Sequence, residues 1–270
     1  MTNRQWRRVP GYVFLSLFAL FSLFPIYFMI VGATNTSQDI LGARILPGWN
    51  LMQNFKDMFA VGNVGSAMYH SAVNAVVTTL LALIVCSIAG YGFEIYHSKG
   101  KDVLMSIMML AMFIPFAATM IPLFQLFADV GMVNSTMAVV MPTVATPFLI
   151  LLFRQSSRTF PHETLEAARI DGLGEISIFA RIYLPMMKPT FAAATVITFM
   201  NSWNSFLWPK VILVANEYQT MPMFTSNLTQ GYVTNYGVLM LSVLIASIPT
   251  MIIFLALQRS FANGITGAIK

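Results

Sequence analysis

Residues 162–185 read HETLEAARIDGLGEISIFARIYLP, a charged stretch in a chain that is otherwise apolar. The first ten residues are good helix formers, with acidic side chains in the first turn, where the helix dipole favours them. Gly172 and Gly174 follow, and glycine ends helices because it adopts positive φ without steric cost. A second short helix is expected over about 175–183. This stretch therefore predicts a helix, a glycine elbow and a second helix.

The composition of the whole chain sets this stretch apart. Of the 270 residues, 57% are apolar and only 9% are Asp, Glu, Lys or Arg, and the mean hydropathy is +0.72. Soluble domains carry about 25% charged residues, so the composition indicates an integral membrane protein. The single cysteine, Cys86, lies in an apolar run and excludes an intrachain disulfide and a cysteine-based metal site.

Long apolar windows lie on both sides of the charged stretch. A spanning helix needs about 20 mostly apolar residues, and a backbone in lipid must satisfy its own hydrogen bonds. Six windows meet this condition: 10–33, 69–93, 103–128, 137–158, 189–209 and 236–258. Prolines inside several of them are expected to kink the helices, either as hinges or as static packing features.

The predicted fold is all-α: a polytopic membrane protein with six transmembrane helices and a cytoplasmic loop. Three segments are expected: 1–68, with the first transmembrane helix and a long outer loop; 69–258, a five-helix core that includes the loop 155–188; and 259–270, a cytoplasmic C-terminal tail. The first window is longer than the apolar region of a signal peptide, so we interpret it as an uncleaved span.

The basic residues indicate the orientation. With the N-terminus inside, twelve of the 15 Lys and Arg residues fall on the inner side, and only Arg44, Lys56 and Lys210 fall on the outer side. The positive-inside rule then places both termini and the loop 155–188 in the cytoplasm. The net charge of +5 therefore reflects topology, and no nucleic-acid partner is expected.

The spacing within the loop resembles a family signature. Glu166-Ala167-Ala168, three residues, Gly172, nine residues, Ile182, one residue and Leu184-Pro185 is similar to the loop of permease subunits of ATP-binding-cassette importers. In that family the loop is a coupling helix that docks into a groove on the cytoplasmic ATPase. The resemblance implies ATPase-coupling roles for Glu166, Ala167, Ala168, Arg169, Asp171, Gly172, Ile182, Leu184 and Pro185. Taken alone, Glu166 is better explained as an acid on a solvated helix face.

The resemblance also implies partners. The sequence contains no G-x-x-x-x-G-K-[ST] phosphate loop and no convergent catalytic set, and its three histidines are far apart. We therefore predict no catalytic residue, metal site or cofactor in this chain, with ATP and Mg on a partner ATPase. The implied assembly contains two ATP-binding-cassette ATPase subunits, a second permease chain in a heterodimer and an extracytoplasmic solute-binding protein. It lies among the lipids of the bacterial cytoplasmic (inner) membrane.

Two further stretches resemble the carbohydrate branch of these permeases, in particular the second permease of maltose-type systems. One is residues 202–209, SWNSFLWP, and the other is the C-terminal end, for which the resemblance implies ATPase contacts. The residues implied at that end are Asn263, Gly264, Thr266 and Lys270.

The cargo is expected to be a carbohydrate. Amide and hydroxyl side chains can bond sugar hydroxyls, so Asn201, Asn204 and Ser205 are candidates for the substrate path. Hydrogen bonding between helices is the alternative role of the two amides, and Trp208 is expected in the aromatic belt at the membrane interface. A permease for a polyol, glycerol phosphate or another small polar solute remains open. An ion-coupled carrier would place a charge near a span centre, and the windows contain none there.

Overall fold

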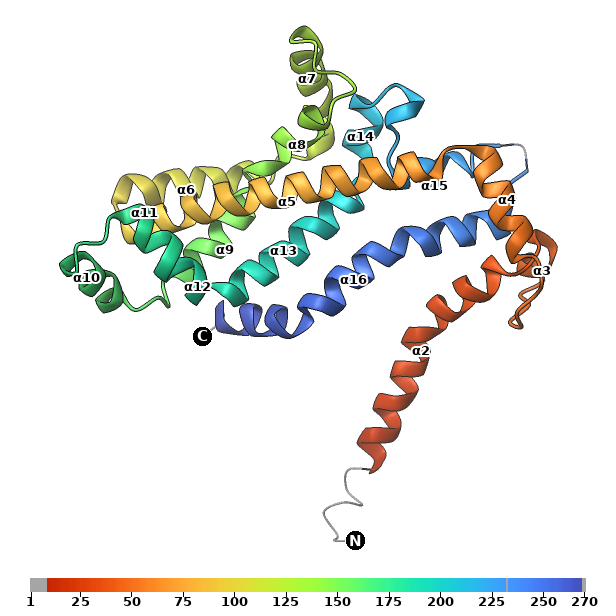
Figure 1. Cartoon of the computed structure of the whole chain (residues 1–270), viewed down its shortest axis with the longest axis horizontal. Coiled ribbons are helices and arrows are strands. Elements are labelled where there is room, and N and C mark those ends of the chain that lie inside the picture. The colour runs from red at the N-terminus through yellow and green to blue at the C-terminus, as the bar shows by residue number, and fades with distance from the viewer. Residues whose placement is uncertain (1–8, 232, 269–270) are drawn as a thin grey trace. The chain divides into compact units, whose positions relative to one another are not determined.

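The structure is a computed structural model that describes residues 9–231 and 233–268, with the backbone alone for Val9 and for 260–268. All regular elements in these two ranges are helical, which confirms the all-α prediction (Figure 1). The chain divides into two compact units, Met1–Val64 with Phe224–Ile248 and Gly65–Met223 with Pro249–Lys270.

The smaller unit is organised around the end of its first long helix. It contains α2 (Val9–Ala33), α3 (Ser37–Leu41), α4 (Leu51–Val61) and the first part of α16 (Tyr236–Ala268). The buried Asn54 donates from Nδ2 to the carbonyl oxygens of Ala33, at 2.9 Å, and Asn35, at 3.0 Å. These bonds satisfy carbonyls that the end of α2 would otherwise leave without partners, so Asn54 fixes α4 against α2.

The larger unit holds the remaining elements. They are α5 (Val64–Ile95), α6 (Lys99–Ala111), α7 (Phe116–Asp129), α8 (Thr136–Val144), α9 (Pro147–Ser157), α10 (His162–Ile170), α11 (Glu175–Ile178), the π-helix η1 (Phe179–Tyr183), α12 (Leu184–Met186), α13 (Lys188–Trp203), α14 (Leu207–Ile212) and the 3₁₀-helix η2 (Asn216–Tyr218). The helix α15 (Met221–Asn227) leads from this unit into the smaller one.

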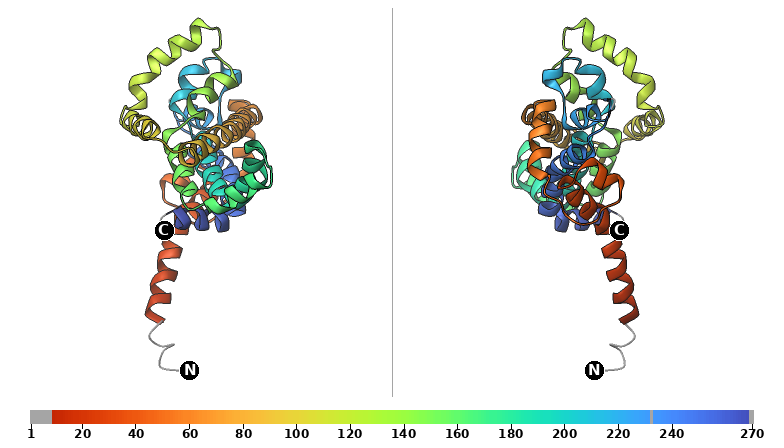
Figure 2. Two further views of the ribbon diagram at one scale, coloured as in Figure 1. Left: turned by 90° about the vertical axis from the view of Figure 1, so that its left-hand side faces the viewer. Right: turned by 90° about the vertical axis from the view of Figure 1, so that its right-hand side faces the viewer.

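The six predicted windows do not all become straight helices. In the described residues, α2, α5 and α16 are long and apolar enough to cross a membrane, and the number rises to five if two bent pairs each count as one span. These pairs are α6 with α7, bent by 99°, and α8 with α9, bent by 46°. Figure 2 shows α7 turning away from α6. The two bent pairs fall in the windows 103–128 and 137–158, where prolines were expected to kink the helices, and the total of six spans stays a prediction.

Prolines account for both breaks. Pro115 precedes α7 in an extended conformation, and Pro147 is the first residue of α9. Proline has no backbone N–H and restricts the residue before it to extended conformations, so a helix cannot run through either position without distortion. A third window, 189–209, is interrupted because α13 ends at Trp203.

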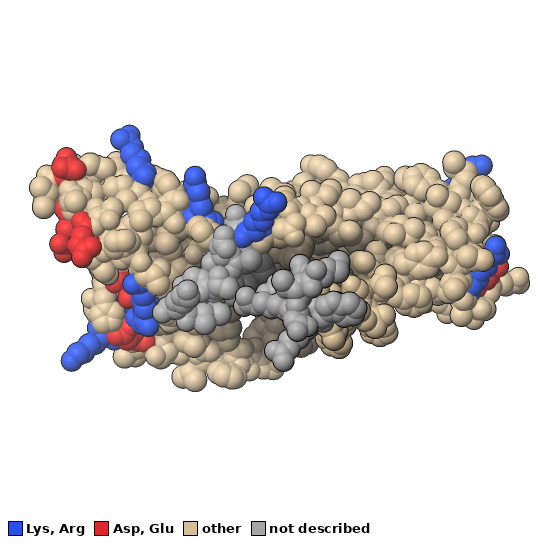
Figure 3. Space-filling model, turned by 90° about the horizontal axis from the view of Figure 1, so that it is seen from below, with Lys and Arg blue, Asp and Glu red and all other residues tan. Residues whose placement is uncertain are grey.

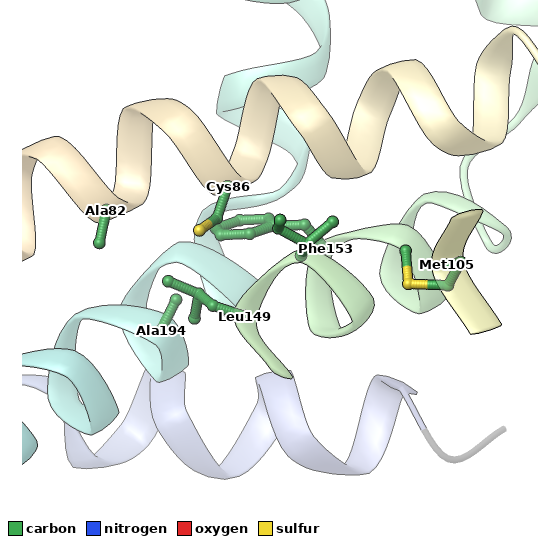
Figure 4. Close-up of a cluster of buried hydrophobic side chains, with 7 residues drawn as sticks. Ala82, Cys86, Met105, Leu149, Phe153 and Ala194 are labelled. Atoms are coloured by element: carbon green, nitrogen blue, oxygen red, sulfur yellow. The ribbon is translucent and has the colours of Figure 1, made fainter. Parts of the chain in front are cut away.

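The core of the larger unit lies where α5 crosses α9 and α13. Cys86, Phe153 and Ala194 are buried there and lie close together from three different helices (Figure 4). The Cys86 thiol donates to the carbonyl oxygen of Val144, at 3.2 Å, at the break between α8 and α9. Small residues on this face let helix backbones approach closely, as is usual in membrane proteins.

Gly90 marks the closest approach between α5 and α9. A Cβ atom at this position would lie 2.5 Å from Phe153 Cβ and 2.8 Å from the backbone nitrogen of Arg154. We expect Gly90→Ala to lower the free energy of unfolding by about 1–3 kcal/mol, because overpacking forces the two helices apart. Thermal unfolding in detergent would measure this change.

Gly92 provides the matched control for that substitution. It lies two residues further along α5, and a Cβ there would meet no atom within 4 Å. Alanine is favoured over glycine inside a helix by about 1 kcal/mol, so Gly92→Ala should leave stability unchanged or raise it. Equal effects of the two substitutions would contradict the packing of α5 on α9.

Candidate functional site

The predicted elbow forms at the end of α10. Gly172 has φ +80°, the left-handed conformation that favours glycine. The Leu173 N–H donates to the Ala168 carbonyl at 3.0 Å, and the Gly172 N–H donates to the Arg169 carbonyl at 3.0 Å. This pair of bonds is the Schellman motif, which satisfies the last carbonyls of a helix. The prediction of positive φ is confirmed for Gly172 and wrong for Gly174, whose φ is −72° because it starts α11 in an extended conformation.

One face of the elbow is a small hydrophobic core. Leu165 and Ala168 from α10 pack with Ile178 and Tyr183 and with Tyr91 from α5. The Tyr183 hydroxyl lies 2.7 Å from the Ser157 hydroxyl, and burial raises the pKa of Tyr183 to about 12, so the phenol stays neutral. These contacts fix the elbow to the ends of α5 and α9. Figure 1 shows α10, α11 and α12 gathered at this end of the larger unit.

The second helix of the elbow differs from the prediction of one regular helix over about 175–183. The segment Phe179–Tyr183 is a π-helix between α11 and α12. Ile178 and Tyr183 are both fully buried, although an α-helix would turn side chains five residues apart by about 140°. The wider π-turn brings both side chains to the same core, which explains the irregularity.

The opposite face of the elbow is exposed. It carries Glu166, Ala167 and Asp171 and two isoleucines, Ile170 and Ile176, which are 86% and 87% exposed. Exposed apolar side chains ringed by charged ones are typical of protein interfaces. Figure 3 shows acidic and basic side chains gathered at the end of the larger unit that carries these helices.

An ion pair holds the two arms of the elbow together across this face. Arg169 Nε lies 2.8 Å from Glu175 Oε1. The hydrogen bond from Arg169 lowers the pKa of Glu175 below its usual value, and Tyr96 lowers it further. The pair therefore fixes the angle at which Ile170 and Ile176 are presented.

The structure distributes the predicted coupling residues over both faces. Ala168 is buried in the core of the elbow, so the small-residue surface consists of Ala167 rather than both alanines. Ile182 packs partly against the same core, while Leu184 and Pro185 are exposed. The two exposed isoleucines were not singled out from the sequence, although an isoleucine on a polar helix is a recognisable signal.

A buried charge cluster beside the elbow was also missed. Arg154 on α9 has a side chain that is only 6% exposed, and its Nε lies 3.2 Å from Glu94 Oε2 on α5. Its Nη2 bonds Asp102 on α6, and Arg158 Nε lies 3.4 Å from the same Glu94 oxygen. The cluster ties three helices together through one guanidinium group. Its members lie on three separate helices, so their pairing could not be predicted from the sequence.

The structure places the predicted substrate-path residues in two different environments. Asn201 and Ser205 line a cavity of about 430 Å³ within the larger unit. Asn204 does not line it, since its Nδ2 donates to the Met200 carbonyl at 2.9 Å and so closes the end of α13. Trp208 lies beyond α13, which ends at Trp203. Trp208 is 2% exposed and donates to the Ala138 carbonyl at 2.9 Å, so its prediction as an interfacial belt residue is wrong as well.

The predicted C-terminal contacts cannot be placed as side chains. The helix α16 continues to Ala268, and Asn263, Gly264 and Thr266 belong to its last turns, where the structure describes the backbone alone. Lys270 lies outside the described residues.

Comparisons with known proteins identify the family of the chain. Residues 82–267 match the family described as binding-protein-dependent transport system inner membrane component, and the chain belongs to this family. It is therefore a non-catalytic membrane subunit of an ATP-binding-cassette transporter.

Individual relatives cover nearly the whole chain. The lactose transport system permease protein LacG of Rhizobium radiobacter is 41% identical over 98% of this chain and 98% of its own length. The arabinooligosaccharides transport system permease protein AraQ of Bacillus subtilis is 33% identical, over 97% of this chain and 96% of its own. A solved bacterial ABC transporter involved in the import of the acidic polysaccharide alginate contains a chain with the same fold, at a TM-score of 0.82 and 21% identity, over 97% and 99% of the two chains.

Proposed function

We propose that this chain is one of two permeases of an ATP-driven importer of uncharged oligosaccharides and that the elbow over 162–185 couples it to the ATPases. The observation that carries the proposal is the exposed face of the elbow, which presents two isoleucines among charged residues at a fixed angle. The other face is anchored to α5 and α9, so movement of the elbow is passed to the helices. This is the arrangement that a coupling element needs.

The source of energy lies outside the chain. ATP favours one conformational state of an ATPase pair. A docked elbow transmits this preference only if the elbow binds the two states with different affinities. The assembly that we propose has two ATPase subunits, a second permease of different sequence and an extracytoplasmic solute-binding protein. The elbow and both termini lie on the cytoplasmic side, in agreement with the distribution of Lys and Arg.

An uncharged carbohydrate is the cargo that fits best. Two relatives at 41% and 33% identity are named for lactose and for arabinooligosaccharides. Among the described residues, no Asp, Glu, Lys or Arg lines the cavity that contains Asn201 and Ser205. A phosphorylated or acidic solute would meet no counter-charge there, whereas sugar hydroxyls find hydroxyl and amide partners.

Site-directed crosslinking tests the coupling role. Ala167→Cys places a thiol on the exposed face of α10, while Ala168→Cys places one in the buried core next to it. The natural Cys86 is fully buried and gives little background. After labelling with a maleimide photocrosslinker in native membranes, Ala167→Cys is expected to capture an ATP-binding-cassette ATPase, and Ala168→Cys is not.

The same crosslinking experiment can also give results that contradict the proposed role of the elbow. Absence of any ATPase adduct at Ala167→Cys, together with absence of an ATPase from gentle detergent preparations of the tagged natural chain, would overturn the coupling proposal. Equal capture from both positions would show that the elbow opens and that the buried face of α10 is not its core.

A further inference from the structure

The larger unit has a second cavity, of about 540 Å³, beside the first turns of α13. Its walls come from α5, from η1 and α12, from α13 and from Leu257 on α16. Leu80, Ile84 and Leu184 in these walls are between 40% and 56% exposed, so the cavity is open to the surroundings of the helices. We call it the basal groove and define it by residues 80–87 of α5 and 188–195 of α13.

The basal groove runs along α5 and α13, which are antiparallel here. Each helix contributes about two turns to it, a length of about 10 Å. Met187 packs in the same cluster as Tyr91, near the end of α5, whereas Ala194 packs in the cluster that contains Ala82. Lys188 therefore lies at the end of the groove nearest the elbow, on the side that we propose to be cytoplasmic. The other end lies deeper between the membrane helices.

The lining of the basal groove fits a hydrocarbon chain. Apart from Lys188, the described lining consists of apolar side chains and two hydroxyls. The Ser87 hydroxyl donates to the Ile84 carbonyl at 3.2 Å, and the Thr195 hydroxyl donates to the Phe191 carbonyl at 2.7 Å. Both hydroxyls are thus bonded within their own helices, and no polar atom of the lining requires a polar solute as its partner. Apolar surface of this kind is covered best by another apolar group.

A positive charge lies at the elbow end of the groove. Lys188 is the one ionisable side chain of the described lining, and it is exposed and forms no ion pair with a described residue. The elements η1, α12, α13 and α16 carry Arg181, Lys188 and Arg259 and no acidic residue. The acid of α5, Glu94, is already bonded to Arg154 on α9. The charge of the groove therefore complements an anion that comes from outside the chain.

An anionic phospholipid supplies both of the required groups. Lysine lays its aliphatic stem along apolar surface and holds its ammonium group at the level of the lipid headgroups. Anionic lipids of the cytoplasmic leaflet attract basic side chains at this level. A lipid without net charge, or an apolar helix of another subunit, would leave the ammonium group without a counter-ion.

We propose that the basal groove binds one anionic phospholipid, with an acyl chain between α5 and α13 and its phosphate at the Lys188 ammonium group. Phe179 and Leu184 of the elbow also line the groove, so the lipid contacts the elbow and the membrane helices at the same time. The lipid comes from the membrane around the chain, and the site does not depend on which solute the importer carries.

Lipid binding is measured on the tagged chain, purified from native membranes together with its partner subunits and then delipidated in detergent. Phosphatidylglycerol and phosphatidylcholine with identical acyl chains are added in turn, and native mass spectrometry counts the lipids that remain bound. Lys188→Gln removes the charge, and Lys188→Arg keeps it. The matched control is Lys99→Gln, which removes an exposed charge at the start of α6, outside the groove.

The natural chain is expected to bind one phosphatidylglycerol more tightly than phosphatidylcholine. Lys188→Gln should lower the affinity for phosphatidylglycerol about fivefold, as the loss of one basic residue beside an anionic headgroup predicts, and should leave phosphatidylcholine binding unchanged. Lys188→Arg and Lys99→Gln should bind like the natural chain. Glycerol phosphate, which has the charged group without the acyl chains, should not displace the lipid at equal concentration.

Three results would overturn the inference. Equal affinity of the natural chain and Lys188→Gln for phosphatidylglycerol would remove the headgroup from Lys188. Displacement by glycerol phosphate would show a site for free phosphate instead of a lipid. Crosslinking of Ile84→Cys to a second permease in native membranes would show that a protein helix fills the groove, since Ile84 lies in its exposed wall.

Discussion

A chain with Glu166→Lys is expected to reach the membrane in normal amounts and to lose ATP-driven uptake. Glu166 is exposed on α10, and no ion pair within the described residues involves it, so the substitution leaves the elbow intact. Lysine is as good a helix former as glutamate. A reversed charge in a docking face costs about 2 kcal/mol or more, which lowers the affinity for the ATPase about 30-fold. Uptake into vesicles loaded with ATP and co-purification of the ATPase measure the two effects.

The control for this substitution is Glu217→Lys, which changes the net charge by the same amount. Glu217 is exposed in η2, far along the chain from the elbow and predicted to lie on the outer side of the membrane. It is expected to leave ATPase binding unchanged. Full uptake by Glu166→Lys at normal abundance would show that the outer face of α10 does not carry the coupling.

Arg154→Met is expected to produce the largest loss of stability among single substitutions in the larger unit. It leaves the Glu94 carboxylate, whose side chain is 15% exposed, without its closest partner. Removing one member of a buried ion pair costs about 3–5 kcal/mol, and the half-exposed Arg158, 3.4 Å from the same Glu94 oxygen, offsets this loss only in part. The midpoint of thermal unfolding in detergent measures the loss, and the abundance of the chain in membranes should fall with it.

Two further variants separate burial from charge. Arg158 also contacts Glu94, at 3.4 Å, but its side chain is 51% exposed, so Arg158→Met should cost less than about 1 kcal/mol. Adding Glu94→Gln to Arg154→Met should restore much of the stability, because the poorly compensated buried charge is gone. A larger loss in the double variant than in Arg154→Met would contradict the assignment of the cost to the buried carboxylate.

Local sequence signals predicted the elbow well. The helix over α10, the positive φ of Gly172 and the turn into a second helix depend on propensity and capping within a few residues, which the sequence contains in full. The all-α class also followed from composition and window length. The coupling assignment came from the spacing of residues such as Glu166 and Gly172, not from any contact.

Features that depend on contacts between helices could not be predicted in this way. The windows around Pro115 and Pro147 contain ample apolar residues, so hydropathy alone does not distinguish a kinked helix from a broken one. The burial of Trp208 depends on the Ala138 carbonyl, which lies 70 positions earlier in the chain. The basal groove beside Lys188 becomes visible only when the neighbours of α5 are known.

The sharp bend between α6 and α7 bears on how this part of the chain can lie in a membrane. Four residues, 112–115, separate the two helices, and Phe113 among them is 85% exposed in the isolated chain. Lipid offers no hydrogen bonds, so a break in a membrane helix must satisfy its own backbone groups. The N–H groups of Met112, Phe113 and Ile114 donate to the carbonyl oxygens of Met109, Leu110 and Ala111, and the Ala118 N–H donates to the Pro115 carbonyl. The turn therefore carries its own hydrogen bonds, and a sharp bend at this place leaves few peptide groups that lipid would have to solvate.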